Sequence, residues 1–305
     1  MNKEMILGHA KEIQYLTKAC RNSRLAHGYF FYGPKDVGKL TVAKGCAAML
    51  LCENQSKKIG GCGVCQACQR MKSETHPNLI VLSLASPFLP IAEDEMKRRS
   101  KISIEEVEAI RRRIALASKD WQIVIVEAAE LLSPDAANSF LKTLEEPNEK
   151  TLFIFISSKP EYVMPTILSR LVPMRFSCPA AGELKRIPGA TAELIQVSRG
   201  LPGVLISMTL DDAQKKHEQG IYRDAWRISQ STVSEALATA GNYQAAADRE
   251  ILLEHLFRLG ESFMITGNAS KSKNISKALR ALETLETTNV NARLATDIIV
   301  MNLHA

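Results

Sequence analysis

The chain has 305 residues, of which 46% are hydrophobic, 24% charged and 6% aromatic, and its formal net charge is +6. No apolar run approaches the roughly 18 residues of a membrane span, and residues 1–4 lack the apolar core of a signal peptide. We therefore expect a cytoplasmic protein of two or three domains without a membrane partner. The positive charge is compatible with nucleic-acid contact but is too small to argue for it alone.

The N-terminal part is predicted to begin with an amphipathic helix over residues 4–20. Residues 28–32 form a short, nearly continuous apolar run, which is typical of a strand buried on both faces of a parallel sheet. A helix is expected next, with its inner stripe between residues 42 and 51. These three elements flank a glycine-containing loop.

Gly33, Gly38 and Lys39 give this loop the G-x-x-x-x-G-K spacing of a phosphate-binding loop. Backbone N–H groups of such a loop face a phosphate, and the lysine adds a positive charge at the helix N-terminus. The next position normally carries the hydroxyl that binds Mg²⁺, but here it is Leu40, and Thr41 points about 100° away on a helix. We leave two interpretations of Lys39 open: a residual phosphate anchor, or a solvated residue of a relict loop.

Seven cysteines in such a chain suggest a metal site or free thiols rather than disulfides. Cys62, Cys65 and Cys68 follow a C-x₂-C-x₂-C pattern, and Cys52 precedes them. Four thiolates at this spacing predict a closed, structural Zn²⁺ site. The alternative is a set of reduced thiols in a loop. His76 is either a further candidate ligand or, as we expect, a turn residue.

The chain then continues with a predicted strand over 79–82 and an irregular segment that ends in the basic run 97–101. We interpret that run as a solvated loop, with DNA contact as the alternative. Ser103 and Glu106 make a capping box for a helix over 104–117.

Further strands are expected at 122–126, 152–156 and 174–176. The first of them runs into Glu127 and Ala128. A working ATPase has a metal-binding Asp at the first position and often a water-polarising acid at the second, and alanine cannot orient water. Alternating strands and helices predict a parallel, three-layer α/β domain whose ligands sit at the carboxyl edge of the sheet.

Residues beyond Cys178 show no strand pattern. The segment 180–208 is predicted to be short, helical and broken, and helical stripes are expected near 222–240, 247–265 and 270–303, with a hinge at 267–269. This pattern favours a separate all-helical domain.

Several segments together resemble the delta-prime subunit family of the bacterial DNA polymerase III clamp loader, within the AAA+ superfamily. The segments that carry the resemblance are 6–9, 24–31, the cysteine group, 76–78, 136–147, 165–170 and 288–294. The resemblance implies an AAA+ type five-stranded parallel sheet with a P-loop over residues 1–177, and a zinc module inserted at 52–68. It also implies a small helical lid at 178–208 and an all-α collar, the oligomerisation domain, at 209–305.

The resemblance further implies a subunit of a ring that uses ATP to place a sliding clamp on primed DNA. Its expected partners are gamma/tau and delta type subunits and, through the assembled complex, the clamp and DNA. Arg170 is implied to act in trans as an arginine finger on the ATP of an adjacent subunit. The alternative is that Arg170 only forms a local ion pair within its own chain. Leu171 stands where this family usually has Cys.

The position where motor subunits carry a nucleotide-sensing arginine is occupied by Val204, and Arg199 is offset from it. With Leu40, Glu127 and Ala128, this favours a non-motor subunit without catalysis of its own and makes ATP binding doubtful. The competing hypotheses are an active AAA+ motor of the gamma/tau type, and a zinc-containing nucleic-acid-binding module built on the cysteines and residues 97–113.

Overall fold

The structure is a computed structural model. It describes residues 6–90, 99–115, 120–230, 233–243 and 246–265. The chain divides into two compact units, one of residues 1–183 with 201–203, the other of residues 184–200 with 204–305. No helix among the described residues is long and apolar enough to cross a membrane.

The first unit is built on a five-stranded sheet in the order β2-β3-β4-β1-β5, and all of its pairings are parallel. Its strands are β1 (Gly28–Tyr32), β2 (Leu79–Leu82), β3 (Gln122–Glu127), β4 (Thr151–Ser157) and β5 (Val172–Arg175). The predicted parallel α/β fold is confirmed.

The register of the strands places three strand ends at one edge of the sheet. Tyr32 at the end of β1 pairs with Ser157 of β4, and Glu127 at the end of β3 pairs with Ile156. The segments that follow β1, β3 and β4 therefore begin side by side at the carboxyl edge, where parallel α/β sheets bind ligands.

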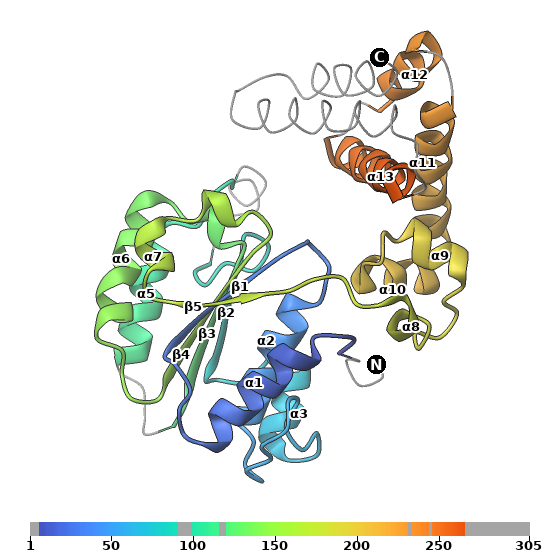
Figure 1. Cartoon of the computed structure of the whole chain (residues 1–305). Helices are drawn as coiled ribbons and strands as arrows, with labels where there is room; N and C mark the ends of the chain where they lie inside the picture. Colours follow the sequence, from blue (N-terminus) through green and yellow to red (C-terminus); the bar gives the residue numbers. More distant parts are fainter. Residues whose placement is uncertain (1–5, 91–98, 116–119, 231–232, 244–245, 266–305) are drawn as a thin grey trace. The chain divides into compact units, whose positions relative to one another are not determined.

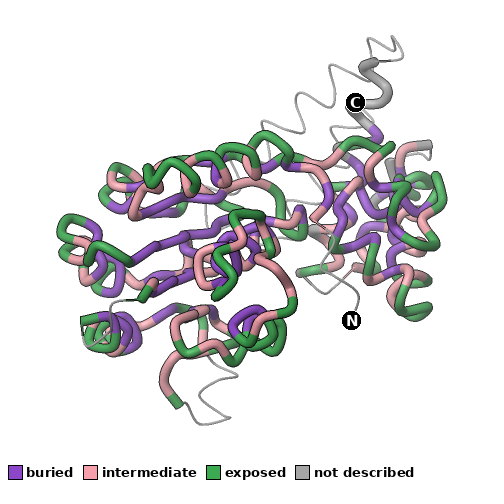
Figure 2. The backbone as a smooth tube through the Cα atoms, turned by 90° about the horizontal axis from the view of Figure 1, so that it is seen from below, coloured by how far each residue is buried: buried purple, intermediate pink, exposed green. Residues whose placement is uncertain are grey.

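Helices cover both faces of the sheet (Figure 1). One face carries α1 (Ala10–Arg21), α2 (Lys39–Leu50) and α3 (Gln66–Lys72); the other carries α5 (Ile104–Ala115), α6 (Pro134–Glu145) and α7 (Pro165–Leu168). Short 3₁₀ turns follow β3 (Ala129–Leu131) and β4 (Pro160–Tyr162). Figure 2 shows the buried strands between helices whose outer turns are exposed.

Two helix predictions were wrong at their N-termini. The helix predicted over 4–20 begins at Ala10, because Gly8 and His9 both adopt left-handed backbone angles (φ 72° and 57°) that a right-handed helix cannot include. The stripe predicted over 222–240 is two helices, α11 (Asp212–Gln230) and α12 (Val233–Gly241). The first begins early because Asp211 accepts the N–H of Ala213 (2.8 Å), an N-terminal cap that the apolar pattern does not reveal.

The prediction that the basic run 97–101 is solvated was also wrong for Arg99, its first described residue. Its side chain is 7% exposed and forms an ion pair with Glu106, which is itself buried. Glu106 also accepts the N–H groups of Ser103 (3.2 Å) and Phe88 (3.1 Å). The predicted capping glutamate is therefore also the buried partner of Arg99.

The second unit is helical in its described part. It contains α9 (Ala192–Val197), most of α10 (Pro202–Leu210), then α11, α12 and α13 (Ala246–Ile265). The short helix α8 (Ala181–Leu184) spans the boundary, and only its last residue belongs to this unit. Its core is apolar and is formed by α11, α12 and α13. The helix predicted over 247–265 is confirmed by α13, whereas the predictions for 267–269 and 270–303 lie outside the described residues. The predicted boundaries at 177 and 208 stay predictions.

Candidate nucleotide, metal and arginine sites

The loop from Gly33 to Gly38 leaves β1 and enters α2 at the carboxyl edge, as predicted. Gly33 has a φ of 140°, and a Cβ there would lie 2.1 Å from the carbonyl oxygen of Phe176. Phe176 in turn donates its N–H to Tyr32 O (2.7 Å), so it continues the pairing of the edge strand. Glycine is therefore required at position 33 by close backbone packing, independently of any phosphate.

Lys39 is buried, with 6% of the residue exposed, and its ammonium group is bound by its own loop. Nζ donates to Gly33 O (2.7 Å) and to Pro34 O (2.6 Å). Burial lowers the pKa of Lys39 to about 8, against the opposing effect of the carboxylates of Asp36, Glu130 and Glu127. Of the two interpretations left open, the solvated lysine is wrong, and the role of a phosphate anchor stays a prediction.

Residues from other parts of the first unit donate hydrogen bonds to the backbone carbonyl groups of Asp36 and Val37 in the loop. His9 Nε2 donates to Val37 O (2.9 Å), and the N–H of Gly203 donates to Asp36 O (3.0 Å). The ring of His9 also packs against that of Phe176, with centroids 4.8 Å apart. The loop is thus held in one conformation by groups of this chain.

The acidic groups opposite the loop come from the end of β3 and the turn after it. Glu127 is the last residue of β3, and Ala128 has a left-handed φ of 56°. Glu130 accepts a hydrogen bond from Ser158 Oγ (3.3 Å), and its other oxygen is buried without a hydrogen bond among the described residues. Glu130 was not predicted as a site residue, because a carboxylate three residues after a strand matches no motif spacing.

This edge of the sheet retains the shape of a nucleotide site but has changed its chemistry. Leu40 supplies no hydroxyl to a cation, and Ala128 supplies no acid to a water molecule. Three carboxylates act on Lys39, the lysine of the motif. Such a site has little positive charge to offer a polyphosphate.

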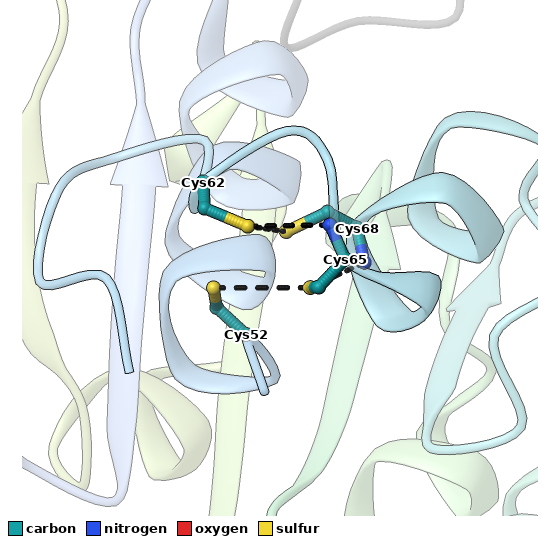
Figure 3. Close-up of side chains that lie close together, drawn as sticks. All are labelled: Cys52, Cys62, Cys65 and Cys68. Atoms are coloured by element: carbon teal, nitrogen blue, oxygen red, sulfur yellow. Dashed lines mark hydrogen bonds between the residues drawn. The ribbon is translucent and has the colours of Figure 1, made fainter. Parts of the chain in front are cut away.

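The four predicted cysteines lie together (Figure 3). All four Sγ atoms lie within 4.8 Å of one another, with Cys52 to Cys65 at 4.0 Å and Cys62 to Cys68 at 3.9 Å. Tetrahedral coordination at a Zn–S distance of about 2.3 Å places the sulfurs about 3.8 Å apart. The group fits a four-thiolate site for a metal ion.

Backbone donors support this fit. The N–H of Cys65 points at Cys62 Sγ (3.3 Å), and the N–H of Cys68 at Cys65 Sγ (3.4 Å). The backbone N–H groups of Val64 and Cys65 lower the pKa of the Cys62 thiol to about 6, whereas burial raises the pKa of Cys68 to about 12. A cation among the sulfurs would hold Cys68 as a thiolate, which water alone would not at neutral pH.

Gly61 and His76 define the surroundings of the cysteine group. A Cβ at Gly61 (φ 67°) would lie 2.6 Å from Cys68 Sγ, so any larger residue would clash with that sulfur.

His76 accepts the N–H of Asn78 at Nδ1 (3.1 Å) and is not in the cysteine cluster, so it is the predicted turn residue.

Arg170 lies in the turn between α7 and β5, and 31% of its side chain is exposed. Its guanidinium group forms an ion pair with Glu145, the last residue of α6, and donates to Thr166 O (2.8 Å) and Ser169 Oγ (3.2 Å). The chain by itself therefore shows the local ion pair, and the role in trans stays a prediction.

A sequence profile of the family described as "DNA polymerase III, delta subunit" matches residues 8–180 of the chain. The chain belongs to this family. It is a DNA polymerase III clamp-loader subunit of the AAA+ type, as the resemblance implied. DNA polymerase III subunit delta′ of Pseudomonas aeruginosa is 36% identical over 177 residues, which is 58% of this chain and 48% of that protein.

The tau subunit of Bacillus subtilis DNA polymerase III is 26% identical over 306 residues, which is 97% of this chain and 48% of that protein. The chain thus spans about half the length of the curated relatives it matches. Among solved structures, a DNA polymerase III gamma subunit-related protein of Thermotoga maritima superposes with a TM-score of 0.50 at 16% identity, over 95% of this chain and 98% of that one. This likeness shows the α/β fold alone.

The second unit contains a charged cluster around Arg199, which the sequence suggested only as an arginine offset from the nucleotide-sensing position. Arg199 is 5% exposed, donates to Glu218 (2.9 Å) and lies 2.7 Å from a carboxylate oxygen of Glu254. His255 lies 3.4 Å from the same guanidinium group. Arg199 is therefore held inside the helical unit, and its isolated place in the sequence gave no signal of these partners.

Proposed function

We propose that the chain is a non-motor subunit of the clamp loader of DNA polymerase III, which hydrolyses no ATP itself and lends Arg170 to an ATP site of a neighbouring subunit. Its direct partners are gamma/tau and delta type subunits. The sliding clamp and primed DNA are reached through the assembled complex, in the cytoplasm.

The observation that carries this proposal is the state of the phosphate-binding loop. The lysine of the motif is bound by Gly33 O and Pro34 O, and Leu40 and Ala128 remove the groups that would bind Mg²⁺ and polarise water. A motor needs all three functions at once, because phosphoryl transfer depends on metal, lysine and oriented water together.

The cysteine group supports a second part of the proposal, a structural Zn²⁺ bound by Cys52, Cys62, Cys65 and Cys68. Four sulfur ligands close a tetrahedral ion and leave no open position for catalysis. The ion would tie the loop after α2 to the N-terminus of α3.

Arg170 supports the role in trans. Its side chain is partly exposed, and exposed ion pairs are worth only about 0–1 kcal/mol. Its guanidinium group can therefore bind a stronger anion as a further partner, because the weak pair with Glu145 does not compete strongly for it. A phosphate of a neighbouring nucleotide would accept charge-assisted hydrogen bonds from it.

The test is ATP hydrolysis by the reconstituted loader carrying Arg170→Ala. We expect turnover at the served site to fall at least about tenfold, because an arginine finger neutralises charge that develops only in the transition state. Arg112→Ala, at an exposed arginine of α5, is the matched control. Unchanged turnover in a complex that assembles normally would overturn the role in trans.

The competing function, an active gamma/tau type motor, has its own signature. The purified chain would then hydrolyse ATP in the presence of Mg²⁺ and lose this activity in Lys39→Ala. We expect no such hydrolysis. An equilibrium titration with a fluorescent ATP analogue, with and without Mg²⁺, separates nucleotide binding from turnover.

A further inference from the structure

The contact between Arg170 and Glu145 joins two elements that are far apart in the sequence. Glu145 ends α6, and Arg170 follows α7, which packs against the same face of the sheet. A carboxylate at a helix C-terminus is normally unfavourable, since the helix end already carries partial negative charge. A cation at this place offsets both charges.

The guanidinium group of Arg170 is fixed from one side only. Three of its five N–H donors are used, two by Thr166 O and Ser169 Oγ and one by Glu145. Within the described residues the other two N–H donors have no such contact. A bidentate contact with one phosphate requires two N–H donors. The fork is therefore oriented before any partner arrives.

The exposure of the pair decides what it contributes. With 31% of the Arg170 side chain and 51% of the Glu145 side chain exposed, the ion pair contributes little to the stability of the fold. The pair matters more for the orientation of the guanidinium group. A free arginine side chain samples many rotamers and loses that conformational entropy when it binds an anion, whereas a side chain already held by Glu145 loses less.

We infer that Glu145 is a positioning residue, which holds the guanidinium group of Arg170 in the orientation that receives a phosphate of a nucleoside triphosphate on the neighbouring subunit. This inference rests on the proposed function of Arg170. Glu145 touches no nucleotide itself, and it acts through Arg170 together with Thr166 O.

The opposite role for Glu145 would be that of a competitor that sequesters Arg170 from the phosphate. The two roles predict changes of opposite sign. Removing a competitor raises turnover, whereas removing a support lowers it. Glu145→Gln distinguishes the effect of the carboxylate charge from that of the acceptor oxygen, since glutamine has no charge but keeps an oxygen that accepts from the guanidinium group.

The experiment measures steady-state ATP hydrolysis by the reconstituted loader carrying Glu145→Ala, Glu145→Gln, Arg170→Ala or the double variant Glu145→Ala/Arg170→Ala. For Glu145→Ala we expect kcat to fall about three- to tenfold with KM for ATP unchanged, because orientation matters in the transition state. Glu145→Gln should stay within about twofold of the unmodified complex. The double variant should match Arg170→Ala alone, because the two residues act as one unit.

Glu146→Ala is the matched control, since it removes the adjacent exposed carboxylate. Thermal unfolding and complex assembly are followed for every variant, and a structural role alone would move these and leave kcat unchanged. Higher turnover in Glu145→Ala, or additive losses in the double variant, would overturn the inference while leaving the function of Arg170 in place. No effect of Arg170→Ala would instead overturn the proposed function itself.

Discussion

Lys39 shows how a single residue of a nucleotide-binding motif can be kept while its surroundings change. Its ammonium group is buried and bound by Gly33 O and Pro34 O, and burial lowers its pKa to about 8. At pH 7 the lysine carries its proton in a place where the charge is costly. The free energy of unfolding of the chain must therefore depend on pH through this residue.

The sign of this dependence follows from the two pKa values. The ordinary value of 10.5 applies to the unfolded chain and about 8 to the folded one, so the unfolded chain holds the proton more tightly. The cost is fully present below pH 8 and is lost as the pH rises to 10.5. Relative to Lys39→Met, the unfolding free energy of the unmodified chain should rise by roughly 2–3 kcal/mol across this window.

Urea unfolding at several pH values from 7 to 10.5 measures this difference. Lys35→Met, at an exposed lysine of the same loop, is the control and should follow the pH profile of the unmodified chain. If the profiles of Lys39→Met and the unmodified chain run parallel, Lys39 is solvated after all.

Motif spacing predicted those site residues that belong to local patterns. The loop glycines, Lys39 and the four cysteines could be found because each lies close in sequence to its partners. Glu145 and Glu130 could not be found, since their partners lie across the sheet edge or on another helix. The motif spacing also predicted that Gly33 is needed for phosphate binding, whereas the structure shows that close packing against the carbonyl of Phe176 already requires a glycine there.

At the scale of elements, strands were predicted better than helix ends. A strand such as β4 is buried along its whole length and reads as a continuous apolar run. Helix starts depend instead on one residue's backbone or cap, as at His9 before α1 and Asp211 before α11. Apolar periodicity contains no information on either.

The cysteine group between α2 and α3 is the element whose folding we expect to depend on a metal ion. We predict one bound Zn²⁺ per chain in the purified protein, and its loss in Cys68→Ala, because three thiolates bind the ion far more weakly than four. The segment 52–68 should then become sensitive to proteolysis.

Metal content by elemental analysis and the visible spectrum after Co²⁺ substitution measure this prediction, since tetrahedral Co²⁺ thiolate sites are intensely coloured. Cys20→Ser, at a cysteine outside the cluster, should keep the full metal content. A metal-free protein whose proteolysis pattern is unaffected by a chelator would show that the cysteines are reduced thiols.

At the scale of the whole chain, the second unit is held together by a buried charge cluster as well as by its apolar core. Arg199 has a left-handed φ of 59° and contacts Glu218 from α11 and Glu254 from α13. Burial and the nearby arginines lower the pKa of His255 to about 3, so this residue is neutral at pH 7. The segment that precedes residue 201 is thereby joined to the two long helices of its unit.

Arg199→Met should destabilise this unit by about 3–5 kcal/mol, because it leaves Glu218 as a buried carboxylate without its cation. The double variant Arg199→Met/Glu218→Leu should recover most of that loss, since apolar residues of similar volume can replace a buried ion pair at little cost. Thermal unfolding of the full chain measures both effects, and Arg223→Met is the exposed control on α11. A single variant as stable as the unmodified chain would mean that the apolar core alone holds the unit, and the cluster would then be dispensable for its stability.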